Sequence, residues 1–305
     1  LRRQRQMCIR DSGHTLFNVI GVIIALSMAP LYLKYIPMLS DNIARQVANT
    51  HTIFNLINAI LFLPFIALFT NFLTKIIPGN DYVKKETKHL DKNLLALPRM
   101  AISAVIKELV VMLETCIEML KKARECTVAY RHKLRNEVSI DEESVDGMQK
   151  NITEYIVEIT RQELPEKHSR LIPAILHSVN DLEKVGDYCE SIVILAQRAF
   201  ENDLTFSEQA RFELDKLFDK TEALMKQTKK ALQYDDHDAA NITLSIEKEL
   251  DQLIEQYKLN HIKRLENDVC ISNAGLVFND ILTDLERLND HLCNITKGIL
   301  HLGKR

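Results

Sequence analysis

Residues 181–187 read Asp-Leu-Glu-Lys-Val-Gly-Asp, and residues 284–290 read Asp-Leu-Glu-Arg-Leu-Asn-Asp, an offset of 103. Four of the seven positions are identical, and the Lys184/Arg287 and Val185/Leu288 exchanges are conservative. A period near 100 residues is too long for a solenoid repeat and is typical of a duplicated three-helix bundle. We therefore predict two three-helix bundles in residues 99–303, at about 99–202 and 207–303.

The pattern of apolar residues around both copies is helical. Between Met100 and Glu125 apolar residues recur with the period of a helix, and alternating runs bounded by Asn-Gly or Gly-Gly turns are lacking. Ser139 or Asp141 is expected to cap a second helix that ends near Pro165, and Ser207 a fourth. An all-α fold follows, with six helices at about 100–125, 139–164, 169–202, 208–234, 238–267 and 272–302.

Two uncharged runs precede this helical region. Residues 13–33 and 46–74 contain no Asp, Glu, Lys or Arg, and a helix of the shorter run reaches ~30 Å, the thickness of a hydrocarbon layer. We expect transmembrane helices at about 14–33 and 52–74, within a transmembrane region 13–78 followed by a linker 79–98. Pro30 and Pro64 are expected to kink or end helices. A pair of core helices in a soluble protein is the alternative.

The charge is unevenly divided. Residues 1–78 carry a formal charge of +5 and residues 79–305 carry −8. Four lysines between residues 75 and 88 outnumber the basic residues of the loop between the spans, so we expect a multi-pass protein of the cell (inner or plasma) membrane with a cytoplasmic C-terminal domain. An acidic domain does not favour nucleic acid. The six cysteines lack Cys-x-x-Cys spacing and are expected to be buried apolar residues in a reducing compartment.

The two apolar runs are related to each other. Residues 14–26 (His-Thr-Leu-Phe-Asn-Val-Ile-Gly-Val-Ile-Ile-Ala-Leu) share seven of thirteen positions with the run that starts at His51, an offset of 37. His14 and Asn18, like His51 and Asn55, are spaced i and i+4 and should share a helix face. Polar residues repeated in two spans suggest a duplicated transporter-type architecture. Hydrogen bonds between helices, or a place at the headgroup level, are the alternatives.

The duplicated heptapeptide carries paired carboxylates. Glu183 and Asp187 lie at i and i+4, and Glu286 and Asp290 repeat the spacing. Like charges so spaced cost a helix a few tenths of a kcal/mol, and the duplication indicates a hard, oxygen-preferring cation such as Mg, Ca, Mn or iron. A solvated acidic face screened by neighbouring basic residues is the alternative. A di-iron enzyme needs two Glu-x-x-His pairs and the sequence has one, at 86–89, so we do not expect an enzyme.

The two repeats in this order resemble bacterial sodium/phosphate cotransporters with a C-terminal PhoU-like domain, over about residues 13–305. The resemblance implies that the uncharged runs are the C-terminal transmembrane helices of a transporter, and that residues 99–303 form a cytoplasmic PhoU-like domain regulating transport. It implies inorganic phosphate as the substrate and sodium as the coupling ion of the full-length protein. It also implies divalent or iron ions on the domain, with ligands Glu183, Asp187, Glu286 and Asp290, and with Asp181 and Asp284 as second candidates.

Part of the family pattern is absent. The family's re-entrant hairpins carry Gln-Ser-Ser motifs, which do not occur here. Residues 1–12 match nothing in the family and are interpreted as an artefactual leader, with a lipid-binding arm as the alternative. We therefore expect an N-terminally truncated sodium-dependent phosphate symporter. The alternative is a membrane-tethered PhoU-like regulator that binds a kinase or transporter without transporting, as a homodimer or with a signalling protein.

Overall fold

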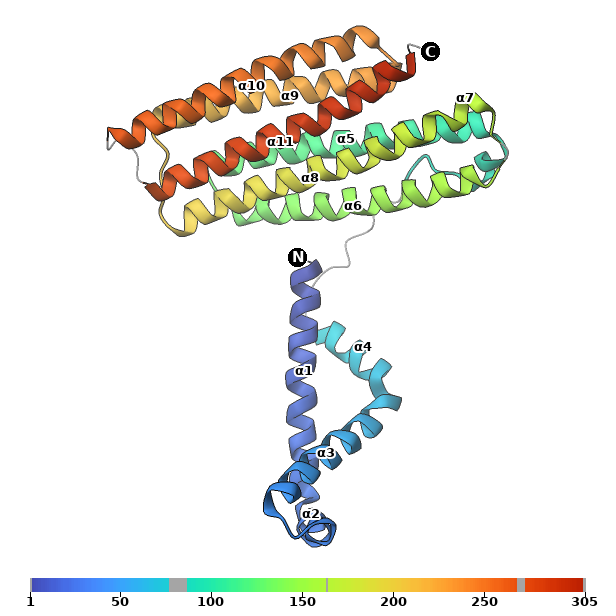
Figure 1. Cartoon of the computed structure of the whole chain (residues 1–305), viewed down its shortest axis with the longest axis vertical. Coiled ribbons are helices and arrows are strands. Elements are labelled where there is room, and N and C mark those ends of the chain that lie inside the picture. Colours follow the sequence, from blue (N-terminus) through green and yellow to red (C-terminus); the bar gives the residue numbers. More distant parts are fainter. Residues whose placement is uncertain (1, 77–86, 163, 268–271, 304–305) are drawn as a thin grey trace. The chain divides into compact units, whose positions relative to one another are not determined.

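The computed structural model describes residues 2–76, 87–162, 164–267 and 272–303, and every regular element among them is a helix. The all-α prediction is therefore confirmed for this part of the chain. Clustering of contacts divides the protein into two compact units, Leu1–Tyr82 and Val83–Arg305. The helices of each unit pack against one another (Figure 1).

The second unit contains six long helices in two sets of three (Figure 1). Within each set every helix packs against the other two, and the sets meet where α8 contacts α11 and where α5 contacts α9. The first set is α5 (Pro98–Val128), α6 (His132–Thr160) and α8 (Leu171–Glu201), and the second is α9 (Glu208–Tyr234), α10 (His237–Glu266) and α11 (Ser272–Gly303). Two short elements complete the unit, η3 (Lys92–Ala96) and α7 (Glu166–Ser169).

One apolar core runs through both sets of helices. Leu113 and Leu182 in the first set and Phe218 and Phe278 in the second belong to the same buried cluster. The expectation that the cysteines are buried is confirmed for the four whose side chains are described, which are the free thiols Cys116, Cys126, Cys189 and Cys293. The side chain of Cys8 and the whole of Cys270 lie outside the described residues.

The ends of the helices agree only partly with the cap residues chosen from the sequence. Ser207 caps α9 as predicted, because its hydroxyl accepts the N–H of Ala210 at 3.2 Å. Helix α6 begins at His132 instead of at Ser139 or Asp141. Leu134 packs on the core and Val138 is fully buried. The apolar face therefore extends the helix past the predicted caps, since packing outweighs local capping.

The first unit is a chain of helices broken at its prolines. It comprises α1 (Arg2–Ser27), α2 (Ala29–Tyr35), η1 (Ile36–Leu39), α3 (Ile43–Phe62), η2 (Leu63–Phe65) and α4 (Ile66–Ile76). Pro30 lies at the start of α2 and Pro64 in η2, as the sequence predicts. The break at Pro64 divides the span expected at 52–74, so that α4 turns back to contact α1 (Figure 1). Residues 2–12, interpreted as a leader, are the start of α1.

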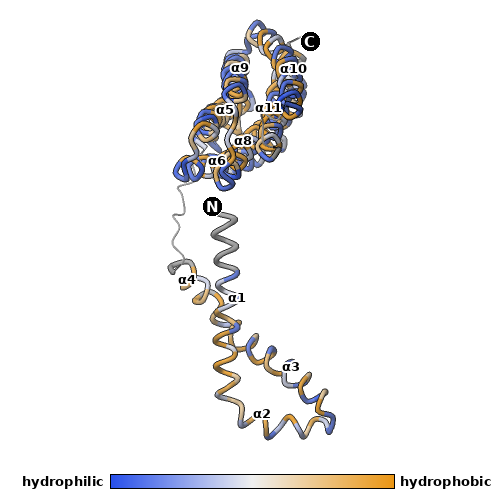
Figure 2. Tube along the Cα trace, turned by 90° about the vertical axis from the view of Figure 1, so that its left-hand side faces the viewer, coloured by the Kyte–Doolittle hydropathy of each residue, from blue (hydrophilic) through white to orange (hydrophobic). Residues whose placement is uncertain are grey.

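Among the described residues, Ile43–Phe65 is the one continuous helical segment long and apolar enough to cross a membrane. A second candidate exists if the helical segments Asp11–Ser27 and Ala29–Leu39, bent by 64°, count as one span. Both assignments rest on length and composition. Apolar residues dominate much of this unit (Figure 2), and many face outward, with Leu33, Met38 and Ile43 each more than 75% exposed.

The 37-residue repeat has a structural counterpart in the crossing of α1 and α3. Gly21 and Asn58 occupy equivalent repeat positions, and a Cβ placed on Gly21 would lie 2.3 Å from Asn58 Nδ2. Asn58 is only 1% exposed, and neither atom of its amide group has a hydrogen-bond partner among the described residues. The two copies thus meet at matching residues, where the absence of a side chain on Gly21 leaves room for the amide.

Candidate metal centre

Glu183 and Asp187 project from α8 with a lysine between them. Lys184 Nζ lies 2.7 Å from Asp187 Oδ2 and 3.1 Å from Glu183 Oε2. The hydrogen bond to Asp187 is the main cause that raises the pKa of Lys184. Because the Lys184 side chain is 47% exposed, its ion pairs with the two carboxylates contribute little to stability. The alternative of a screened acidic face therefore describes part of the site.

Helix α6 adds two carboxylates to this face. Oxygens of Glu142, Asp146 and Asp187 all lie within 4.8 Å of one another. Among the described residues this is the one group of three acidic, histidine or cysteine side chains with ligand atoms so close together. We call it, together with Glu190 of α8, the α6/α8 cluster. Three converging carboxylates suit a hard cation such as Mg²⁺, Ca²⁺ or Mn²⁺.

Crowding in the α6/α8 cluster disfavours the charged form of Glu142. Burial, and then repulsion by Asp146, Glu190 and Asp187, raises the pKa of Glu142 to about 8. At neutral pH and without a counterion, Glu142 therefore holds a proton. A bound cation would displace that proton, because it stabilises all the carboxylates together.

The raised pKa of Glu142 predicts how stability depends on pH in the absence of divalent cations. In the unfolded chain Glu142 titrates near its ordinary value of 4.5, whereas in the folded domain it keeps its proton to about 8. Between these values the folded state binds more protons, so stability falls as pH rises. We expect a loss of about 1–2 kcal/mol from pH 5 to pH 8, after allowance for solvent screening.

Urea unfolding at pH 5 and at pH 8, in the presence of a chelator, measures this loss of stability. The Glu142→Gln variant should lose less stability between the two pH values than the wild-type chain. If the variant loses as much stability as the wild-type chain, Glu142 is not the group responsible for the pH dependence.

A second acidic cluster occupies the equivalent place in the second set of helices. We call Glu247 and Asp251 of α10, with Glu286 and Asp290 of α11, the α10/α11 cluster. Burial, followed by repulsion from these three neighbours, raises the pKa of Asp251. Lys258 Nζ lies 2.6 Å from Glu286 Oε2. No three of its oxygens form a close group among the described residues, so this cluster is the more open of the two.

Asp181 and Asp284, the second candidates, take part in the contact between α8 and α11. The Nδ1 atom of His291 lies 2.8 Å from Asp181 Oδ1, and the Ser191 hydroxyl donates to Asp284 Oδ2 at 2.6 Å. Tyr188 and His291, equivalent by the 103-residue offset, stack with ring centroids 5.8 Å apart. Both aspartates thus interact across the junction of the two sets, and neither belongs to the close group of oxygens.

Glu142, Asp146, Glu247 and Asp251 were not among the predicted ligands. Their signal is the same Glu-x-x-x-Asp spacing on the middle helix of each set, at an offset of 105. The residues between them share little identity, so a search for a repeated heptapeptide does not find them. The fold is needed to show that this helix faces the duplicated motif.

The polar repeat of the first unit forms hydrogen bonds within each helix. The Nδ2 atom of Asn18 lies 3.2 Å from His14 Nε2, and that of Asn55 lies 3.3 Å from His51 Nδ1 and Nε2. Each pair shares a face, as the i,i+4 spacing predicts, and all four side chains are exposed. A role in transport stays a prediction.

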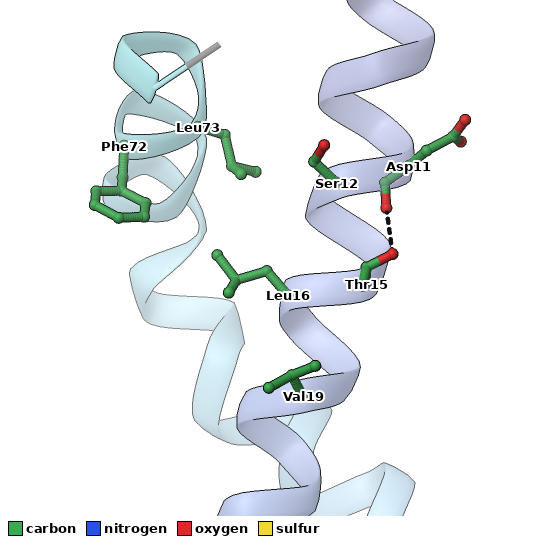
Figure 3. Close-up of a pocket in the computed structure, with 7 residues that line it drawn as sticks. All are labelled: Asp11, Ser12, Thr15, Leu16, Val19, Phe72 and Leu73. Carbon is green, nitrogen blue, oxygen red and sulfur yellow. Dashed lines mark hydrogen bonds between the residues drawn. The ribbon is translucent and has the colours of Figure 1, made fainter.

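An open groove of about 610 Å³ lies between α1 and α4 of the same unit (Figure 3). Its polar residues come from one stretch of α1, where the Thr15 hydroxyl donates to the carbonyl oxygen of Asp11 at 2.9 Å. Since the remaining lining is mostly apolar, the groove offers no converging ligand set. It is lined by Asp11, Ser12, Thr15, Leu16, Val19, Phe72 and Leu73.

Comparison with known proteins assigns the second unit. The family model described as the PhoU domain matches twice, at residues 109–196 and 214–299. These matches cover more than half of the chain and coincide with the two sets of helices. The phosphate-specific transport system accessory protein PhoU homolog of Deinococcus radiodurans is 24% identical over 197 residues, which are 64% of this chain and 91% of that protein. PhoU homolog 1 of Thermotoga maritima is 25% identical over 186 residues, 61% of this chain and 79% of its own length.

Solved structures share the fold of this unit. PhoU from Pseudomonas aeruginosa superposes with a TM-score of 0.62 at 23% identity, over 67% of this chain and 97% of that structure. The phosphate transport system regulatory protein PhoU from Streptococcus pneumoniae superposes with a TM-score of 0.61 at 16% identity, over 68% of this chain and 96% of that structure. With both three-helix sets matched by the family model, the chain belongs to the PhoU domain family.

Proposed function

We propose that the chain is a membrane-tethered PhoU-like regulator of phosphate transport. The observation that carries the proposal is the double match of the PhoU domain to the two helix sets, which are preceded along the chain by a unit whose helices expose large apolar side chains. The curated relatives are named as accessory proteins of a phosphate-specific transport system. By analogy, the partner of this domain is a phosphate transporter or a kinase that controls one.

The proposed location is the cell membrane, with the helical domain on the cytoplasmic side. The outward-facing apolar residues of the first unit support this, since exposed apolar surface of that extent marks contact with lipid or with further apolar helices. Lys75, Lys84, Lys85 and Lys88 after the second run favour a cytoplasmic domain under the positive-inside rule.

Phosphate uptake tests the regulatory proposal. Cells grown in phosphate-rich medium with and without the chain are compared for uptake of radiolabelled phosphate. A regulator changes the uptake rate although the transporter is unchanged. Equal uptake in both strains, with the chain shown to be present in the membrane fraction, would refute a regulatory role under that condition.

A divalent or iron ion on the α6/α8 cluster is the proposed signal or structural ligand. The close group formed by Glu142, Asp146 and Asp187 supports it. Metal analysis of the purified chain in detergent is the test, with Glu142→Gln combined with Asp187→Asn as the variant. Glu114→Gln is the control, because Glu114 pairs with Lys229 outside the cluster. We expect the double variant to lose metal and the control to retain it. Unchanged metal content in the double variant would discard this cluster as a binding site.

A second candidate is the C-terminal part of a sodium-dependent phosphate symporter. The observation that favours it is the crossing of the two apolar repeats at Gly21 and Asn58, which fits a duplicated transport architecture. Reconstitution of the chain in vesicles with an inward sodium gradient tests whether the chain transports by itself. The reading frame upstream of codon 13 separates the candidates, because two Gln-Ser-Ser hairpins encoded there would support the symporter. Sodium-dependent phosphate uptake by the chain alone would establish a transporter and refute a purely regulatory role.

A further inference from the structure

The segment that leads into the helical domain is docked on it. The sequence predicts a linker at 79–98; residues 77–86 lie outside the described residues, but residues 87–97 are described and contain η3. Asp91 caps η3, since its carboxylate accepts the N–H of Asn93 at 2.8 Å. The apolar side chains of the segment pack against the main core of the domain, and they are Leu90, Leu94 and Leu95.

Two buried side chains of the domain hold the backbone of this segment. Glu108 of α5 is 1% exposed, and its Oε2 accepts the N–H of His89 at 3.0 Å. Tyr155 of α6 is 6% exposed, and its hydroxyl donates to the carbonyl oxygen of Asp91 at 2.7 Å. The segment is therefore fixed to two different helices of the first set.

The second set of helices contains a buried glutamate equivalent to Glu108, and its partners are different. At an offset of 105, Glu108 corresponds to Glu213, which is 2% exposed. In the second set the carboxylate of Glu213 finds its partners within its own bundle. Asn260 Nδ2 donates to its Oε1 at 2.9 Å, and Arg264 Nη1 lies 2.8 Å from its Oε2.

The first set lacks these two partners. The residues equivalent to Asn260 and Arg264 are Tyr155 and Ile159. Ile159 has no polar group, and Tyr155 directs its hydroxyl to the carbonyl oxygen of Asp91. The buried carboxylate of the first set is instead satisfied by a backbone N–H from outside the bundle. A buried acceptor without a donor is costly, so this set is built to receive the segment.

We infer that residues 87–97 form a latch, a segment at the start of the helical domain that docks on α5 and α6 and can be released from them. When docked, the latch fixes the point on α5 and α6 from which the chain continues toward the first unit. When released, it frees about ten residues, which can span ~30 Å. Docking and release thus change the length of free chain that precedes the helical domain.

Helix α6 connects the latch to the acidic face. It carries Glu142 and Asp146 of the α6/α8 cluster, and it carries Tyr155 nine residues further on, about 14 Å along the axis. We infer that a cation bound by Glu142, Asp146 and Asp187 would draw α6 toward α8 and so shift Tyr155 relative to Glu108 on α5. This coupling step rests on the proposed cation site, whereas the latch itself rests on the two contacts described above.

Hydrogen exchange of the full chain in detergent tests the latch. Tyr155→Phe removes one hydrogen bond and should speed exchange of amides in residues 87–97 about fivefold. Tyr130→Phe is the matched control, because it removes a hydroxyl that contacts His132 at 3.3 Å near the opposite end of α6. The control should leave exchange in residues 87–97 unchanged.

Glu108→Met distinguishes a latch from a purely structural contact. Methionine fills similar space but accepts no N–H, so exchange in residues 87–97 should rise at least tenfold. The slowest amides of α5 and α8 should exchange no faster than before, since an apolar residue replaces a buried carboxylate. If neither Tyr155→Phe nor Glu108→Met changes exchange in residues 87–97, the latch is refuted.

Titration with Mn²⁺ tests the coupling separately. We expect Mn²⁺ to change exchange in residues 87–97 at least twofold in the wild-type chain and to have no effect in the Glu142→Gln, Asp187→Asn variant. Mn²⁺ that binds without changing this exchange refutes the coupling and leaves the cation site intact. No binding of Mn²⁺ or of other divalent ions refutes the cation site and the coupling with it, while the latch is still judged by the two single variants.

Discussion

Replacing Arg264 with methionine is expected to destabilise the second set of helices by about 3–5 kcal/mol, the cost of breaking a buried ion pair. The side chains of Arg264 and Glu213 are only 7% and 3% exposed, and Arg264 Nη1 lies 2.8 Å from Glu213 Oε2. No guanidinium nitrogen has an aligned hydrogen-bond partner within the described residues. Charge, together with the Phe278 ring 5.1 Å below the guanidinium, therefore holds the pair.

The double variant Arg264→Met, Glu213→Leu should recover most of this loss. Removing both charges leaves no buried ion to neutralise, and similar pairs elsewhere are replaced at little or no cost. Urea unfolding of the full chain in detergent gives the free energies of unfolding. The transition is monitored by hydrogen exchange of the slowest-exchanging amides of α9–α11. A loss below about 1 kcal/mol for Arg264→Met would show that the pair is solvated enough to be dispensable.

Gly275→Ala is expected to cost about 2–3 kcal/mol, because it places a methyl group where α11 packs tightly against His261 of α10. A Cβ on Gly275 would lie 2.3 Å from His261 Cε1 and 2.7 Å from its Nε2. The imidazole is 7% exposed and packs against the Phe278 ring at 5.5 Å, so it has little room to move. The helices would have to separate or the ring would have to leave its place.

Gly298→Ala, on the same helix, is the control and should have the opposite sign. Nothing lies within 4 Å of a Cβ at Gly298, so alanine should stabilise the helix by about 0.5–1 kcal/mol. The same unfolding measurement applies to both variants. Destabilisation of similar size at the two sites would mean that close approach at His261 is not the cause.

Repetition made the second unit predictable from its sequence. The heptapeptide at 181–187 and its copy gave the length of the repeat, and the helical period with the expected caps placed five of the six helices within about three residues. The start of α6 was wrong because Ser139 and Asp141 resemble caps, while the apolar residues before them pack on the core. Cap residues indicate where a helix can begin, but packing of its apolar face on the core decides where it does begin.

The candidate site was half predictable for a similar reason. The carboxylates of α8 and α11 lie in a heptapeptide that is repeated within the chain, whereas Glu142 and Glu247 share only the spacing to the aspartate four residues on. Their proximity to the repeat depends on which face of the middle helix turns toward α8 or α11, and this is a property of the packed bundle. Likewise, the equivalence of Glu108 and Glu213 is visible at an offset of 105, but the different partners of the two carboxylates are not.

The most direct test of the account compares phosphate uptake in three strains grown in phosphate-rich medium. One lacks the chain, one carries it, and one carries the Glu142→Gln, Asp187→Asn variant at equal abundance in the membrane fraction. The account predicts that the wild-type chain alters uptake and that the variant resembles the strain without it, because the proposed regulation depends on the proposed cation at the close group of Glu142, Asp146 and Asp187. Uptake by the variant equal to that of the wild-type strain, or equal uptake in all three, would contradict the account.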